Sequence, residues 1–168
     1  MGCPASADVM DQAQLISRLT AGEPFGGHVP ERIDTHISVV FLTADRAYKL
    51  KRALKTAYLD YRELSDRKRG CAREIAINRR TAPEIYLRTV PVTQDAGGFL
   101  TLGGAGKPLE WLVEMTRFDP RSTLDVLAPS GAIGPSEFIA LADQIAGLHR
   151  VAAVVEGSYF PDMLNRVI

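Results

Sequence analysis

Two lysines and one glutamate are the side chains whose types and spacing best suit a chemical role. Lys49 and Lys51 stand in the run AYKLK at residues 47–51, among residues rich in Val, Phe and Tyr that favour a strand. Because side chains alternate along a strand, both lysines point to the same face, and geometry alone does not choose between them. Glu74 is the only acid between residues 67 and 83, and it borders the apolar stripe of an expected helix. A lysine that meets such a carboxylate across a helix and a sheet is suited to holding an anion.

The charge distribution also favours an anionic ligand. Residues 46–80 hold 12 of the 20 Lys and Arg residues against four acids, which gives this span a charge of +8 in a chain whose net charge is zero. Nucleotide phosphates and a nucleic-acid backbone are both ligands that such a span attracts. A solvated helix face explains most of these residues equally well.

The order of the expected elements predicts an α+β fold. A helix over residues 8–20, capped by Asp8, is followed by strands at 31–36, 38–43 and 46–52 and a long helix at 62–81. Further strands are expected at 87–94, 99–102 and 109–118, and then helices at 122–127 and 135–155. The short connections between the first three strands favour antiparallel pairing, since parallel neighbours need a crossover of about a dozen residues. We expect a five-stranded antiparallel sheet with one long helix, the order of the small lobe of the protein-kinase fold.

A series of short strings carries a resemblance to a known family. They are THIS (35–38), VVFLT (39–43), RAYKLK (46–51), YLDY (58–61), NRR (78–80), APEIYL (82–87) and VPV (90–92). In this order they resemble the N-terminal part of bacterial aminoglycoside-phosphotransferase-like proteins, over roughly residues 12–150. These kinase-fold proteins are often fused to a C-terminal P-loop ATPase domain.

The resemblance implies binding of ATP with Mg²⁺ and transfer of the γ-phosphoryl group to a hydroxyl of a small molecule. It implies that Lys49, singled out by its Ala-x-Lys spacing, holds the α- and β-phosphates and that Glu74 orients it. A turn at residues 36–38 would cover the phosphates with its N–H groups, and an interlobe hinge at residues 114–117 would meet the adenine. The remaining cofactor-binding residues are therefore His36, Ile37, Ser38, Glu114, Met115 and Thr116.

The sequence departs from the family pattern at two places. No G-x-G-x-x-G precedes the second strand, so the phosphates would be covered by a shorter turn. Leu148-His149-Arg150 begins like a kinase catalytic loop, but Val151 stands where Asp is required. We interpret His149 as a helix residue packed in the core of the large lobe. No catalytic residue and no Mg²⁺ ligand is identified, and we expect a fragment or a truncated product that transfers no phosphate by itself.

The domain organisation follows from these assignments. We expect an N-terminal helix in residues 1–25, a kinase-like small lobe in residues 26–118, and a hinge exit with incomplete large-lobe helices in residues 119–168. The two distant cysteines and the lack of an apolar stretch of 18 residues favour a reducing cytoplasm and no membrane. The expected partners are a nucleotide, an unknown small-molecule acceptor, and the missing large lobe and P-loop ATPase domain. The alternative is a non-catalytic nucleotide- or nucleic-acid-binding module that uses the basic span 46–80.

Overall fold

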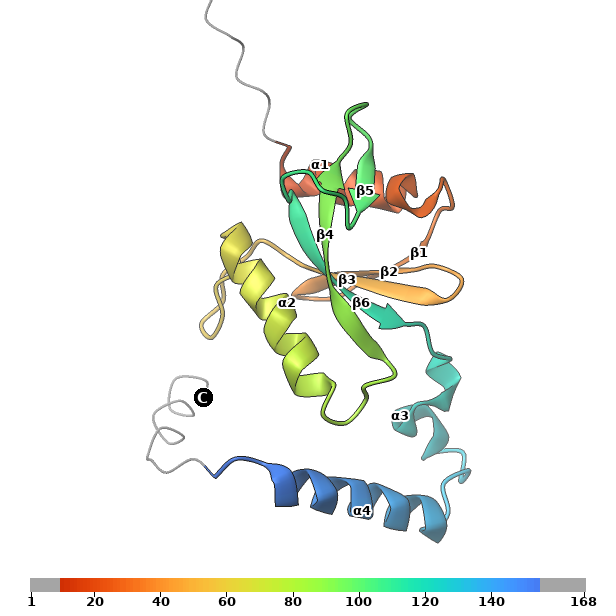
Figure 1. Ribbon diagram of the computed structural model, residues 1–168. Coiled ribbons are helices and arrows are strands. Elements are labelled where there is room, and N and C mark those ends of the chain that lie inside the picture. The colour runs from red at the N-terminus through yellow and green to blue at the C-terminus, as the bar shows by residue number, and fades with distance from the viewer. Residues whose placement is uncertain (1–9, 155–168) are drawn as a thin grey trace, which may run out of the picture.

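The fold is known from a computed structural model that describes residues 10–154. Its centre is a single sheet in which every neighbouring pair of strands is antiparallel, in the order β1-β2-β3-β6-β4-β5 (Figure 1). The strands are β1 (Glu31–Asp34), β2 (Ser38–Leu42), β3 (Arg46–Lys51), β4 (Tyr86–Gln94), β5 (Leu100–Leu102) and β6 (Glu110–Thr116). The predicted α+β class and antiparallel pairing are confirmed.

The expected number of five strands is wrong, because the sheet has six. All six segments expected to be strands join it, including the three-residue strand β5, which pairs with β4 across a turn at residues 95–98. Asp95 accepts hydrogen bonds at its carboxylate from the main-chain N–H groups of Gly97 and Phe99, both at 2.9 Å. This turn returns the chain against β4, so even a very short strand joins the sheet.

The helices lie near their expected positions, with shorter ends. They are α1 (Gln12–Thr20), η1 (Glu23–Phe25), α2 (Leu64–Asn78), η2 (Pro120–Ser122), α3 (Leu124–Leu127) and α4 (Pro135–Val151). Asp11 caps α1 by accepting from the N–H of Gln14 at 2.7 Å, and the Gln14 side chain accepts from the N–H of Asp11. The cap expected at Asp8 lies outside the described residues. No helix within residues 10–154 is both long and apolar enough to cross a bilayer.

Each face of the sheet has its own apolar core. On one face, α1 contributes Leu15, Ile16 and Leu19, which pack with Phe41 and other strand residues. On the opposite face, Cys71 of α2 packs with strand residues of β3 and β6. Figure 1 shows α2 along the side of the sheet and α1 near β4 and β5. Because the two cores hold both faces of the strands, the sheet is a fixed frame for residues on β3.

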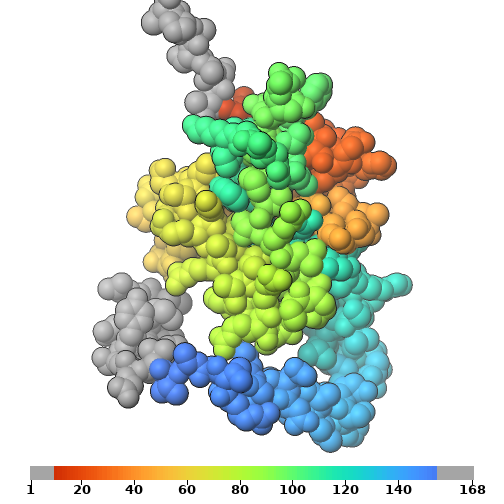
Figure 2. Space-filling model, in the orientation of Figure 1, coloured from red at the N-terminus to blue at the C-terminus, as the bar shows by residue number. Residues whose placement is uncertain are grey.

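The segment after β6 lies apart from these cores. Figures 1 and 2 show α4 below the sheet, joined to it through α3. None of the α4 residues is buried, and its large apolar side chains Phe138, Ile139 and Ile145 are exposed. His149 is helical, as expected, and within the described residues its side chain is exposed at the last turn of α4. Its packing in the core of a large lobe stays a prediction.

Candidate functional site: two lysines on one glutamate

Lys49 and Lys51 lie on the α2 side of the sheet. In the β2–β3 register Val40 lies opposite Lys49, and Ser38 lies opposite Lys51. These positions share a face with Ala47, a member of the core that α2 covers. The alternation of the strand therefore directs both ammonium groups toward α2.

Glu74 of α2 meets both lysines. The Nζ of Lys49 donates to Oε1 of Glu74 at 2.8 Å, and the Nζ of Lys51 donates to Oε2 at 2.7 Å. The predicted contact between Lys49 and Glu74 is confirmed as geometry. The second contact is an addition, because the sequence offered Lys49 and Lys51 as alternatives and the structure uses both.

The three side chains differ in their exposure to solvent. The exposed fraction is 6% for the Lys51 side chain, 12% for Glu74 and 30% for Lys49. Burial by itself lowers the pKa of Lys51, but the hydrogen bond and charge of Glu74 outweigh it, so the pKa of Lys51 is raised. Burial raises the pKa of Glu74, but its hydrogen bonds to the two lysines outweigh this and the pKa is lowered. Lys51 and Glu74 are therefore both ionised at neutral pH.

Tyr61 covers the buried lysine. The Nζ of Lys51 lies 5.2 Å from the centre of the Tyr61 ring, within the range of a cation–π contact. The ring also lies against α2 at Gly70, where a Cβ atom would be 2.8 Å from Cε1 of Tyr61 and 3.0 Å from Cδ of Lys51. A glycine in the middle of this helix is explained by that close approach.

The turn expected at residues 36–38 joins β1 to β2, and its last residue, Ser38, is the first residue of β2. It is closed by Thr35, whose N–H donates to the carbonyl of Ser38 at 2.9 Å and whose hydroxyl accepts from the N–H of Ser38 at 3.0 Å. Among the described residues, the N–H groups of His36 and Ile37 form no hydrogen bond. The buried Ser38 hydroxyl also has no hydrogen-bond partner there. Of the three N–H groups expected to cover the phosphates, those of His36 and Ile37 are therefore free within the described residues, and that of Ser38 is engaged by Thr35.

The hinge is not where the sequence predicted it. Glu114, Met115 and Thr116 are residues of β6, which is paired with β3 on one side and β4 on the other. The N–H of Thr116 donates to the carbonyl of Ile85 at 2.9 Å. Residues 114–116 are therefore not the expected hinge, because β6 is a central strand that is paired on both sides.

The chain leaves the sheet at Arg117 and Phe118. The N–H of Arg117 still donates to the carbonyl of Asp45 at 3.0 Å. Within residues 10–154, no hydrogen bond uses the main-chain N–H or C=O of Phe118. Free main-chain groups of the kind that read a nucleobase therefore occur after β6 rather than within it.

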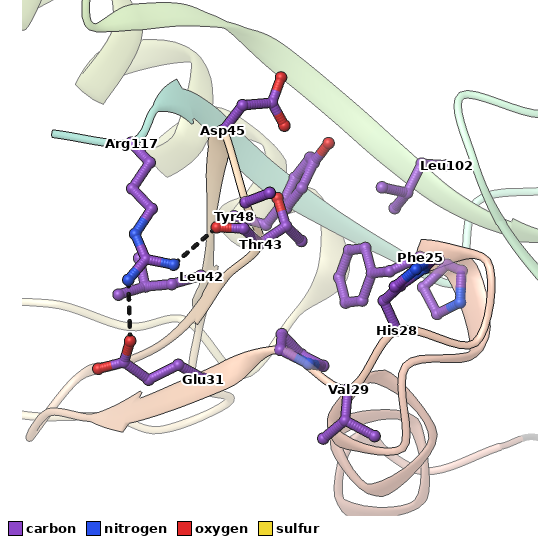
Figure 3. Close-up of a pocket in the computed structure, with 13 residues that line it drawn as sticks. Phe25, His28, Val29, Glu31, Leu42, Thr43, Asp45, Tyr48, Leu102 and Arg117 are labelled. Atoms are coloured by element: carbon purple, nitrogen blue, oxygen red, sulfur yellow. Dashed lines mark hydrogen bonds and ion pairs between the residues drawn. The ribbon is translucent and has the colours of Figure 1, made fainter.

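A hollow lies next to this exit, over Tyr48 and Phe25 (Figure 3). Its volume is about 560 Å³, and Arg117, the last residue of the expected hinge, is the one residue among those lining it that the sequence reasoning placed near ATP. Arg117 at its rim donates to the carbonyl of Thr43 at 2.8 Å and to the carboxylate of Glu31 at 3.0 Å. The guanidinium is thus engaged within the protein, and the hollow is separate from the lysine pair.

The sequence reasoning missed a buried ion pair that holds α2 on the sheet. The Nε of Arg67 donates to Oε2 of Glu110 at 2.8 Å, and the two side chains are 8% and 1% exposed. Gln12 of α1 donates to the same carboxylate at 2.8 Å. The sequence does carry a signal for this pair. Glu110 lies on the same strand face as Leu112, and Arg67 lies on the same helix face as Cys71, so both charges occupy positions expected to be buried.

The basic span 46–80 is largely neutralised by internal ion pairs. Eight of its 12 Lys and Arg residues form ion pairs with carboxylates, namely Arg46, Lys49, Lys51, Arg52, Lys55, Arg62, Arg67 and Arg69. Lys68 lies over the ring of Trp111 at 4.5 Å. These contacts reduce the charge that the span offers to a nucleic-acid backbone.

Residues that hold a metal ion are not gathered in the described part of the chain. No group of three or more His, Cys, Asp or Glu side chains within residues 10–154 is arranged to bind one. Cys71 is buried, and burial raises the pKa of its thiol to about 12. The thiol is therefore protonated at neutral pH and is a core side chain.

The fold and this cluster define a class of protein: an α+β chain in which a lysine pair on the third strand of an antiparallel sheet meets a glutamate of the following helix. Similar proteins are found in mycobacteria. Uncharacterised proteins of Mycobacterium tuberculosis and Mycobacterium bovis are 30% identical to the chain over 119 residues, which are 71% of this chain and 22% of each relative. The chain thus spans about a fifth of the length of these relatives. No protein-family model and no solved structure matches it.

Proposed function

We propose that this chain is the ATP-binding part of a kinase-like phosphotransferase that resembles the aminoglycoside-phosphotransferase-like proteins. The observation that carries the proposal is the hydrogen bond of 2.8 Å between Lys49 and Glu74, which joins the third strand to the long helix. In kinases a lysine and a glutamate on these two elements form the pair that holds the α- and β-phosphates. Lys49 would contact these phosphates here, and Glu74 would orient Lys49.

The surroundings of the pair supply what the rest of a nucleotide needs. Val40 and Leu42 are partly exposed and lie at the margin of the α2-side core, on the same face as Lys49. They offer apolar surface to one side of a base. The free main-chain groups of Phe118 lie at the exit of β6, where a base edge would be read, and the N–H groups of His36 and Ile37 lie at the turn, where phosphate oxygens would be covered.

The proposal concerns binding and not the chemical step. Phosphoryl transfer needs an aspartate that orients the attacking hydroxyl and ligands that hold Mg²⁺. Val151 stands where the resemblance requires the first aspartate, and no other group of this chain is assigned to either task. This chain by itself would bind ATP weakly, and the acceptor hydroxyl belongs to a small molecule that the residues do not identify.

Equilibrium binding of ATP tests this proposal. The 168-residue chain is titrated with ATP and Mg²⁺ beside Lys49→Met and the control Lys107→Met, which removes the same charge from an exposed residue of a distant loop. We expect Lys49→Met to weaken binding by about 10- to 100-fold, since a hydrogen bond to a charged group contributes about 1.5–3 kcal/mol. Lys107→Met should bind as the unsubstituted chain does. Equal affinities for all three proteins would refute the proposal.

The same titration distinguishes the nucleic-acid alternative. Binding to single- or double-stranded DNA through a basic surface falls steeply as salt is raised from about 50 mM to about 200 mM. Tight DNA binding with this salt dependence, together with no ATP binding, would favour that alternative. The ion pairs of the basic span lead us to expect weak DNA binding at both salt concentrations.

A further inference from the structure

We infer that the two lysines have different tasks. Lys51 is the permanent partner of Glu74 and positions α2, whereas Lys49 is the lysine that binds the ligand. The inference deepens the proposed nucleotide site and rests on it. It differs from an arrangement in which one lysine contacts both the glutamate and the ligand.

The first step is the geometry of the carboxylate. Each oxygen of Glu74 has its own ammonium partner, Oε1 with Lys49 at 2.8 Å and Oε2 with Lys51 at 2.7 Å. One lysine can therefore leave while the carboxylate keeps a charged partner. Two ammonium groups and one carboxylate also leave one positive charge in the cluster, which favours a phosphate ligand.

The second step is the unequal burial of the lysines. The Lys51 side chain is 6% exposed, its Nζ lies over the Tyr61 ring, and its stem lies against Gly70. Moving Lys51 would separate a buried charge from its partner, which is costly. Lys49 is 30% exposed, so water can replace Glu74 at its ammonium group. Lys49 is therefore the lysine that can release Glu74 and bind a ligand instead.

The consequence concerns α2. Because Lys51 holds Glu74 without help from a ligand, α2 stays against β3 whether the site is empty or filled. Phosphates then draw Lys49 away without releasing the helix. Lys51 is a positioning residue in this arrangement, and it need not touch the ligand.

The test compares Lys49→Met with Lys51→Met, which make the same change two residues apart on one strand face. Hydrogen exchange of α2 amides and the fluorescence of Trp111 report the docking of the helix. Trp111 is the single tryptophan of the chain, and its carbonyl accepts from the Cys71 thiol of α2 at 3.5 Å. Binding of ATP to the 168-residue chain is measured in parallel.

We expect Lys49→Met to leave α2 exchange and Trp111 emission near those of the unsubstituted chain and to weaken ATP binding by about 10- to 100-fold. Lys51→Met is expected to accelerate α2 exchange by at least about tenfold and to shift Trp111 emission to the red, because Glu74 loses its buried partner. Equal loosening of α2 in both variants, or unchanged α2 exchange in Lys51→Met, would overturn the inference.

Lys51→Arg keeps the test decisive if Lys51→Met does not fold. This variant retains the charge, so the α2 amides are expected to stay protected from hydrogen exchange. Its affinity for ATP is expected to lie within about threefold of that of the unsubstituted chain, because a change of that size is smaller than the contribution of a charged hydrogen bond. A loss of ATP binding as large as that of Lys49→Met would show that Lys51 itself contacts the ligand and would overturn the inference. If the unsubstituted chain binds no ATP, the proposed function fails, and the α2 comparison still decides whether Lys51 alone holds the helix.

Discussion

Replacing Glu110 by glutamine removes a charge from the interior with almost no change of shape. The Glu110 side chain is 1% exposed, and its oxygens accept from Arg67, from Gln12 at 2.8 Å and from the N–H of Trp111 at 3.0 Å. In the variant, Arg67 remains buried and charged without a carboxylate, and the new amide group cannot accept at its nitrogen. Breaking a buried pair from one side costs about 3–5 kcal/mol. We expect Glu110→Gln to lower the free energy of unfolding by about this amount.

Urea denaturation monitored by circular dichroism measures this loss. A domain of this size has a slope of about 2 kcal/mol/M in urea, so the midpoint should fall by about 1.5–2.5 M. The matched control is Glu84→Gln, because Glu84 is exposed and its side chain forms no ion pair within the described residues. The control should change the free energy of unfolding by less than about 0.5 kcal/mol. A Glu110→Gln midpoint within about 0.3 M of the unsubstituted chain would refute the claim that this pair holds α1, α2 and β6 together.

Three further predictions concern the neighbourhood of the lysine pair. Gly70→Ala should destabilise the chain by about 1 kcal/mol although alanine favours helices. The new Cβ would force the Tyr61 ring away, and overpacking of this kind costs about 1–3 kcal/mol. A urea midpoint equal to or higher than that of the unsubstituted chain would contradict this. The Cys71 thiol should react with a disulfide reagent only after urea unfolds the chain, since burial raises its pKa to about 12; fast reaction in the native state would show that α2 opens. The contribution of Glu74 to stability should be complete above its ordinary pKa of 4.5 and be lost as the pH falls through its lowered folded-state pKa. In Glu74→Gln the free energy of unfolding should therefore fall less steeply toward acid pH than in the unsubstituted chain. Parallel pH profiles for the two proteins would contradict the pairing of the Glu74 carboxylate with the lysines.

The strands of the first half were predictable because the signals are local. Alternation and short polar turns at residues 36–38 and 43–45 placed β1, β2 and β3 to within two residues. The same alternation put Lys49 and Lys51 on one face, and the isolated acid of a basic helix identified Glu74. Local pattern could not choose between the lysines, because each contact depends on where α2 docks.

The hinge assignment failed because local sequence patterns do not show which distant strands pair with each other. The resemblance placed the hinge at Glu114, yet this residue lies in a central strand and its carboxylate accepts from Arg88 at 2.6 Å. β3 and β4 cover both edges of β6 from positions far away in the chain. The pair of Arg67 and Glu110 was missed for a similar reason, since charged residues are usually assigned to solvent and these two are 43 residues apart.

Protection of Lys49 from acylation tests the account most directly, because it uses the chain without substitutions. The protein is treated with an amine-reactive ester with and without millimolar ATP and Mg²⁺, and each lysine is quantified by mass spectrometry. We predict that ATP protects the partly exposed Lys49, that the buried Lys51 is little modified in either case, and that the exposed Lys107 reacts equally in both. Acylation of Lys49 that is the same with and without ATP would contradict the assignment of this cluster as a phosphate site.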